Sequence, residues 1–217
     1  MTFVEILLTL LKGAGYTLLI TFSCAATALV VGLGIAMARE LGGAWLSALL
    51  SAVVYVLRGV PMLVLLFIVF FGLPGIGLDV PPLPAMMLSL GLISGAYLSE
   101  VFRGAFAEVS PNEVLAAQSM GFTRFETLRV IKLPQMIRFA VPGIVNELTT
   151  VLKFSPFAYT VGLPEITKQA MALVATTMRG IEIYAAIGLL YFGIYRLLLA
   201  AVQLIEKRYS IPGFAQE

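Results

Sequence analysis

Long runs of apolar residues, separated by short polar segments, dominate this chain. A helix needs about twenty predominantly apolar residues to cross the hydrocarbon core of a bilayer. Five runs reach or approach that length, at 15–38, 44–71, 85–98, 139–163 and 183–205, and glycine and proline interrupt the second. The pattern predicts an all-α membrane protein in which five transmembrane helices form one domain over residues 1–217.

Basic residues are divided unequally between the two sides that five crossings create. One side holds the first loop, a polar insert at about 108–135 and the C-terminal segment, and it carries Arg39, Arg103, Arg124, Arg129, Lys132, Arg138, Lys207 and Arg208. The other side carries Lys12, Lys168 and Arg179. Because lysine and arginine accumulate in cytoplasmic loops, we expect an outer N-terminus and a cytoplasmic C-terminus. Residues 1–11 are too short to cross and are expected in the interface, and the Gly- and Pro-rich 72–84 is expected to be a loop.

The polar insert carries start and stop signals for two short helices. Ser110 and Glu113 have the spacing of a capping box. Gly121 suits a left-handed helix exit, and Thr123 with Glu126 begins a second box. Two interpretations are open for this unit: a structured loop that covers the helix bundle, or a lever that docks on a cytoplasmic partner.

The insert also resembles the signature loop of ABC importer permeases. The resemblance lies in the spacing of Ala116-Ala117, Gly121 and the run Ile131-Lys132-Leu133-Pro134. The usual motif begins Glu-Ala-Ala, whereas Leu115 takes the place of its glutamate here. In that family the first helix of the loop is the coupling helix, which docks on the ATPase subunit. The resemblance therefore implies a set of docking residues: Glu113, Leu115, Ala116, Ala117, Met120 and Gly121.

Other stretches resemble one branch of that family, the polar amino-acid importers of the histidine/glutamine/arginine type. They are Arg58-Gly59-Val60-Pro61, Gly95-Ala96-Tyr97, the run from Glu100 to Gly104, Leu152-Lys153, and Glu206-Lys207-Arg208-Tyr209. After Lys153 the chain departs from the branch, because it reads Phe154-Ser155-Pro156 in place of Asp-Thr-Ser. This departure leaves the charge preference of the substrate open.

The resemblance implies a type I ABC importer permease in the bacterial inner membrane. Such a subunit imports a polar or charged amino acid, or a derivative, by alternating access. The implied partners are two ATP-binding cassette ATPases, a second identical or homologous permease, an extracytoplasmic solute-binding protein and the lipid bilayer, with no nucleic acid. ATP and Mg²⁺ are expected to be used by the ATPase partner, and this chain is expected to bind no cofactor or metal.

The fourth apolar run contains polar residues at helical spacing. Asn146, Thr149, Thr150 and Lys153 fall at i, i+3, i+4 and i+7 and so share one helix face, with Glu147 beside them. An ammonium group at membrane depth is expensive unless it meets water, a partner or a ligand. Two interpretations are open: a buried network in which Lys153 is neutralised or reaches an interface, or a face that lines a translocation pathway and contacts substrate.

Prolines and one further aromatic residue complete the candidate pathway. Pro61 and Pro156 are expected to break helices, and broken helices at membrane depth are tolerated where they line a cavity. Arg58, beside the first break, either reaches the headgroups or lines an inner gate. Tyr97, in the third run, is a further candidate for substrate contact.

Several classes of function find little support in the residues. The chain has 0 His and 1 Cys, and it lacks a Gly-x4-Gly-Lys-[Ser/Thr] phosphate loop, so ATP hydrolysis is expected in a separate subunit. An intramembrane enzyme would need a nucleophile with a base or paired carboxylates, and no such arrangement is evident. A passive channel or a secondary transporter remains the alternative to an ATP-driven importer.

Overall fold

The computed structural model describes residues 2–209, and it describes their side chains as far as residue 202. Every regular element in this part of the chain is helical. The α-helices are α1 (Phe3–Leu11), α2 (Ala14–Leu41), α3 (Ala44–Gly59), α4 (Met62–Phe67), α5 (Pro82–Met86), α6 (Leu92–Ala107), α7 (Pro111–Ser119), α8 (Arg124–Thr127), α9 (Leu133–Phe154), α10 (Ile166–Thr177) and α11 (Gly180–Tyr209). Ile68–Gly72, Met87–Gly91 and Leu128–Lys132 are π-helical, and Leu73–Ile76 and Ser155–Val161 are 3-10 helices.

The long apolar helices occur where the hydrophobic runs predict them. Among the described residues, three helices are long and apolar enough to cross a membrane: Ala14–Leu41, Pro82–Ala107 and Gly180–Val202. The second of these extends beyond the predicted 85–98 at both ends. It can start as early as Pro82 because proline is accepted in the first turn of a helix. The prediction of a loop over 72–84 was therefore wrong at both of its ends, which are helical.

The second apolar run is broken at the predicted proline. Ala44–Gly59 and Met62–Ile76 together could form one span, bent by 99°. Val60 between them is extended, with φ −87° and ψ 128°, because a residue before proline avoids the helical region. α9 covers the fourth run, 139–163, only as far as Phe154, where a 3-10 helix replaces it, and α9 carries three charged residues, Arg138, Glu147 and Lys153.

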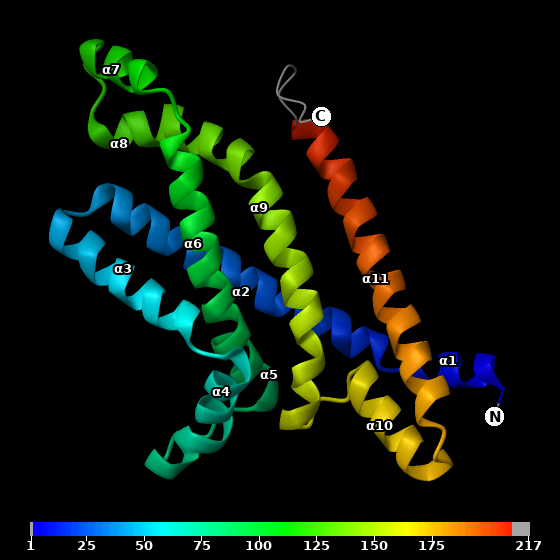
Figure 1. The fold of residues 1–217 in the computed structure, drawn as a ribbon. Coiled ribbons are helices and arrows are strands. Elements are labelled where there is room, and N and C mark those ends of the chain that lie inside the picture. Colours follow the sequence, from blue (N-terminus) through cyan, green and yellow to red (C-terminus); the bar gives the residue numbers. More distant parts are fainter. Residues whose placement is uncertain (1, 210–217) are drawn as a thin grey trace.

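Close packing of α2 on α6 forms the centre of the bundle (Figure 1). A Cβ atom on Gly95 would lie 2.9 Å from the Cβ of Val31, and one on Gly32 would lie 2.7 Å from the Cβ of Leu98. A side chain at either glycine would therefore push the two helices apart. A Cβ atom on Gly91, just before α6, would likewise lie 2.8 Å from the Cβ of Thr27 on α2.

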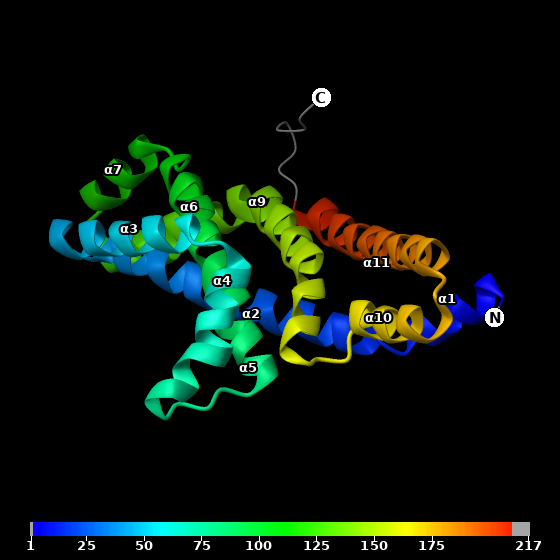
Figure 2. The same cartoon turned by 60° about the horizontal axis from the view of Figure 1, so that its bottom comes forward.

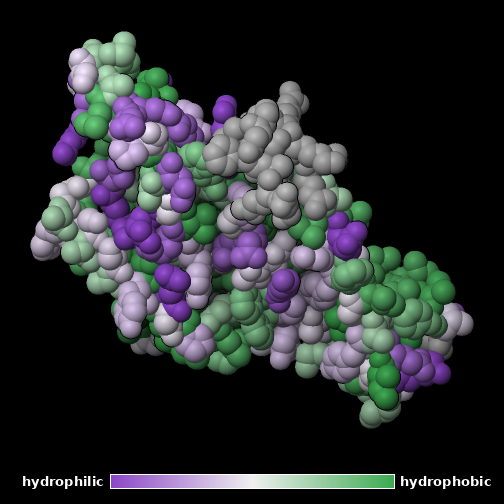
Figure 3. Space-filling view, turned by 45° about the horizontal axis from the view of Figure 1, so that its top comes forward, coloured by the Kyte–Doolittle hydropathy of each residue, from purple (hydrophilic) through white to green (hydrophobic). Residues whose placement is uncertain are grey.

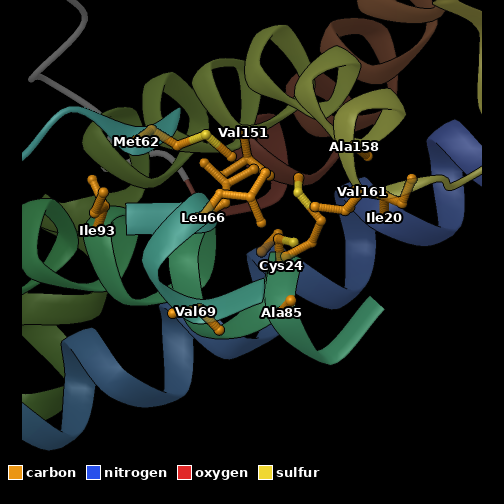
Figure 4. Packing of buried hydrophobic residues seen from close by; sticks show 13 residues of the cluster. Ile20, Cys24, Met62, Leu66, Val69, Ala85, Ile93, Val151, Ala158 and Val161 are labelled. Atoms are coloured by element: carbon orange, nitrogen blue, oxygen red, sulfur yellow. The ribbon is translucent and has the colours of Figure 1, made fainter. Parts of the chain in front are cut away.

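Buried apolar side chains gather in separate clusters. One cluster joins α2, the segments around α4 and α5, and the end of α9, and it includes Cys24, Leu66, Ala85 and Val151 (Figure 4). A second cluster lies at the opposite end of α2. In a third, α1 packs its Ile6 and Leu10 against α10 and α11 (Figure 2). The N-terminal helix thus has a protein-facing side, in addition to any contact with the membrane interface.

The polar insert forms the expected helical hairpin, composed of α7, α8 and the π-helical turn. Gly121 has φ +89°, and the backbone N–H of Phe122 donates to the carbonyl of Ala117 at 3.1 Å, as in a Schellman motif. The capping box of Thr123 and Glu126 is confirmed. The box predicted at Ser110 was wrong, because its side chain makes no capping hydrogen bond. Glu113 instead accepts a hydrogen bond from the Gln135 side chain.

Candidate functional site

A cavity of about 280 Å³ lies where the broken α3–α4 helix meets α6 and α9. The polar or helix-breaking residues in its wall are Arg58, Pro61, Ser94, Tyr97, Glu147 and Thr150. Five of these six are residues that the sequence identified as candidates. The tertiary structure brings together the two separate predictions, a gate at a helix break and substrate contacts on α6 and α9.

Arg58 and Tyr97 lie in contact in the cavity wall. The central carbon of the Arg58 guanidinium lies 4.8 Å from the Tyr97 ring centroid, which is a cation–π geometry. The Tyr97 hydroxyl also lies 3.5 Å from the Arg58 carbonyl oxygen, to which it donates a long hydrogen bond. These contacts connect α6 to the last turn of α3, immediately before the break.

Glu147 is the carboxylate of the cavity, and its side chain is only partly satisfied. The residue is 7% exposed, and Ser94 of α6 is its side-chain hydrogen-bond partner. Oε1 of Glu147 is buried and has no hydrogen-bond partner among the described residues. A buried acceptor without a donor is costly, so this oxygen is suited to receive an N–H donor from a molecule in the cavity.

The polar residues predicted to share one face of α9 lie in different environments. Thr150 lines the cavity, together with Glu147 and Phe154. The hydroxyl groups of Thr149 and Thr150 donate to the backbone carbonyl of Asn146, at 2.8 and 3.0 Å. Asn146 and Lys153 are exposed on the helix and lie outside the cavity wall.

Lys153 faces α11 rather than the cavity. Its Nζ lies 5.5 Å from the ring centroid of Tyr195. Pro156 also lies outside the cavity wall, at the point where α9 passes into the 3-10 helix Ser155–Val161. Pro142 is accommodated inside α9 without ending it.

Ser94 is the polar side chain of the cavity wall that sequence reasoning missed. Leu90, Ser94 and Tyr97 fall at i, i+4 and i+7, so they share a helix face, and all three line the cavity. The spacing from the candidate Tyr97 was the signal that could have identified Ser94.

The hairpin presents part of its predicted docking set to the outside. Leu115 is 59% exposed and Met120 is 79% exposed, and Ala116 and Gly121 are also at the surface. Ala117 is buried, so only one member of the small pair is accessible. Hydrophilic side chains gather on this end of the molecule (Figure 3). The hairpin projects at the same end of the bundle as the C-terminal end of α11 (Figure 1).

Comparison with known proteins gives a consistent family assignment. Residues 30–211 match the family described as "Binding-protein-dependent transport system inner membrane component". The chain is 34% identical over 200 residues to the probable amino-acid ABC transporter permease protein YckA of Bacillus subtilis, covering 92% of this chain and 88% of YckA. It is 33% identical over 214 residues to the histidine/lysine/arginine/ornithine transport system permease protein HisQ of Escherichia coli, covering 93% of each chain.

Solved structures agree with this assignment. A chain in a crystal structure of an amino acid ABC transporter with histidines superposes with a TM-score of 0.86 at 29% identity, covering 94% of this chain and 96% of the other. A chain of the inward-facing MetNI methionine ABC transporter gives a TM-score of 0.79 at 19% identity and supports the fold alone. The fold is thus that of a type I ABC importer permease. The chain therefore belongs to the family of binding-protein-dependent transport system inner membrane components.

Proposed function

We propose that this protein is the permease subunit of an ATP-driven importer of polar or charged amino acids or their derivatives. Its family membership and the names of its relatives support the transport of amino acids. In this proposal α9 also crosses the membrane, which brings the number of spans to five. The N-terminus is outside and the hairpin is cytoplasmic. The distribution of basic residues supports that orientation.

The observation that carries the proposal is the pair of opposite charges in the cavity. Arg58 provides a guanidinium in its wall, and Glu147 provides a buried carboxylate oxygen without a donor. A free amino acid has an α-carboxylate and an α-ammonium, which are complementary in charge to these two groups. Charge-assisted hydrogen bonds of this kind are among the stronger ones available in proteins.

The second permease subunit is proposed to cover the polar side of α9. Asn146 and Lys153 are exposed in this chain within a segment assigned to the membrane. Polar side chains at that depth face protein or a water-filled pathway rather than lipid. An identical or homologous permease facing Asn146 and Lys153 would complete the pathway.

The hairpin is proposed to dock on an ATPase subunit. Leu115 and Met120 are exposed apolar side chains at the C-terminal end of α7, which exits through the left-handed Gly121. Two such ATPases, which use ATP and Mg²⁺, would drive the pair of permeases, and an extracytoplasmic solute-binding protein would deliver the substrate. The α3–α4 break and the Arg58–Tyr97 contact then serve as a gate during alternating access.

Reconstitution tests the proposal directly. The permease, its ATPase, any second permease and the solute-binding protein are placed in proteoliposomes, and uptake of a panel of amino acids is measured with and without ATP. We expect uptake only with ATP and the ATPase subunit. Equal uptake by the permease alone, without nucleotide, would instead indicate a channel or a secondary transporter.

A further inference from the structure

An ion pair joins the hairpin to a helix that is distant in the sequence. Lys132, at the end of the π-helical turn, pairs with Glu40 in the last turn of α2, 92 residues away. The two side chains are 20% and 31% exposed, so the pair is partly shielded from water. Lys132 Nζ also lies 5.6 Å from the ring centroid of Phe106 on α6. A single ammonium group therefore touches α2 and α6 at once.

A second ion pair locks the same end of α2 to α6. Arg39, adjacent to Glu40, lies with Nη1 2.6 Å from Oε1 of Glu100, and these side chains are 12% and 23% exposed. The other carboxylate oxygen of Glu100 accepts a hydrogen bond from Nε of Arg103 at 2.8 Å. Charge-assisted hydrogen bonds connect the end of α2 both to the hairpin and to α6.

Apolar packing below these pairs includes both the hairpin and α2. Leu128 of the hairpin is 2% exposed and belongs to one buried cluster with Ala36 of α2, Phe106 of α6 and Met136 of α9. The ion pairs therefore lie over a continuous contact and not over an open gap. Removing one charge at the rim leaves this cluster in place.

The chain connections show what such a link adds for α2. The hairpin follows α6 directly and leads directly into α9, so its movement reaches these helices through the backbone. No segment connects the hairpin to α2 in this way. Yet α2 supplies Ile20 and Cys24 to the cluster that contains Met62, Leu90 and Val151, next to the cavity.

We infer that the Lys132–Glu40 ion pair transmits movement of the hairpin to α2, and that Arg39–Glu100 makes α2 and α6 respond together. The inference rests on the proposed function. Lys132 and Glu40 are positioning residues in this scheme, because they act on the pathway through the helices they join. A change of ATPase position then reaches α2 directly through this pair, in addition to its packing on α6.

The experiment compares variants in the complete reconstituted complex. Glu40→Gln, Lys132→Met and the double variant are assayed for amino-acid uptake and for ATP hydrolysis in the same vesicles. Glu182→Gln is the matched control, because it removes an ion pair with Arg179 that spans only i,i+3. The melting temperature and subunit composition of each complex are measured in parallel.

We expect each single variant to hydrolyse ATP at a rate near that of the wild type and to import several-fold fewer molecules per ATP. Because the two residues act through each other, the double variant should import no fewer molecules per ATP than the more impaired of the two single variants. The control should keep the wild-type ratio. An unchanged ratio in the single variants, or losses that multiply in the double variant, would overturn the inference.

Three outcomes distinguish failure of the inference from failure of the proposed function. Failed assembly or a markedly lower melting temperature in the single variants would also overturn the inference, because the pair would then hold the fold. Uptake by the wild type without ATP would refute the proposed function itself. ATP-driven uptake by the wild type, with an unchanged ratio in Glu40→Gln, would refute only the inference about α2.

Discussion

The guanidinium of Arg58 lies over the aromatic ring of Tyr97, with its central carbon 4.8 Å from the ring centroid. Arg58 belongs to the last turn of α3, and Tyr97 lies in α6. Both residues line the 280 Å³ cavity. If the break serves as the proposed gate, widening the cavity there would separate this cation from the aromatic face, so the contact would favour the closed position.

Replacing Tyr97 by alanine should weaken that closed position. A cation–π contact stabilises by about 0.5–2 kcal/mol, so we expect a roughly twofold to thirtyfold increase in ATP-independent leak of preloaded amino acid from proteoliposomes. Tyr97→Phe is the control, because it keeps the ring and removes only the long hydrogen bond. Equal leak from the alanine and phenylalanine variants and the wild type would contradict a gating role for the ring.

Glu147→Gln should impair transport while preserving the fold. The amide keeps the size of the side chain and removes its charge, and a hydrogen bond to a charged group contributes about 1.5–3 kcal/mol. We expect roughly a tenfold to hundredfold weaker apparent affinity in uptake assays. Glu182→Gln, whose carboxylate is half exposed outside the cavity, should behave as the wild type. Wild-type affinity in Glu147→Gln would remove the carboxylate from the proposed site.

Lys153→Met tests the other face of α9. The ammonium lies against Tyr195 and outside the cavity, on the side where we place the second permease. We expect lower uptake or a shifted substrate range in a competition assay with several amino acids. Lys12→Met, which changes an exposed lysine after α1, serves as the control. Unchanged kinetics in Lys153→Met would indicate a structural role in α9–α11 packing.

Gly121→Val should disturb the hairpin without removing the protein from the membrane. Gly121 has φ +89°, and the left-handed conformation costs an L-residue about 1–2 kcal/mol, with β-branched residues the least tolerant. We expect ATP hydrolysis to continue while uptake per ATP falls several-fold. Gly43→Val is the matched control, because Gly43 has φ −73° and a Cβ atom there would meet no other atom within 4 Å. Normal coupling in Gly121→Val would argue against a rigid turn.

Glu165 provides a test by pH. The residue is fully buried at the N-terminus of α10, where its carboxylate accepts hydrogen bonds from the backbone N–H groups of Thr167 and Lys168 and from the Tyr191 hydroxyl, at 2.7, 2.8 and 2.8 Å. Burial raises the pKa of this carboxyl above its ordinary value of 4.5, although the hydrogen bonds oppose the shift. The folded protein therefore binds the proton more tightly than the unfolded chain does.

The sign of the pH dependence follows from that difference. A raised carboxyl pKa contributes stability that is full below the ordinary pKa and is lost as pH rises through the raised value. Glu165→Gln cannot titrate, so its melting temperature should decline less than that of the wild type as pH increases over this interval. Parallel melting curves across the interval would contradict a titrating role for Glu165. Glu165→Ala should be less stable than both at every pH, because three donors lose their acceptor.

Much of the architecture could be predicted from local sequence patterns. The hydrophobic runs located the long helices, because burial in lipid demands continuous apolar length and this is a property of the sequence alone. Pro61 located the break in the second run, and Gly121 and Thr123 located the turn and the second helix of the hairpin. Each of these residues affects the backbone only within a few positions along the chain.

The details that failed depend on contacts between distant segments. Glu113 was expected to cap its own helix, but it meets Gln135, which is 22 residues away. Ala117 was expected at a docking surface, but the fold of the hairpin buries it. No local pattern shows which of two available partners a side chain will choose.

The sequence by itself determined that α9 has polar positions at helical spacing and that a proline breaks the second run. Only the tertiary structure decided that Glu147 and Thr150 face Arg58 and Tyr97 across a cavity, while Lys153 turns toward α11. The physical reason is that helical periodicity specifies which residues share a face, but the neighbouring helix that each face meets is chosen by packing of the whole bundle.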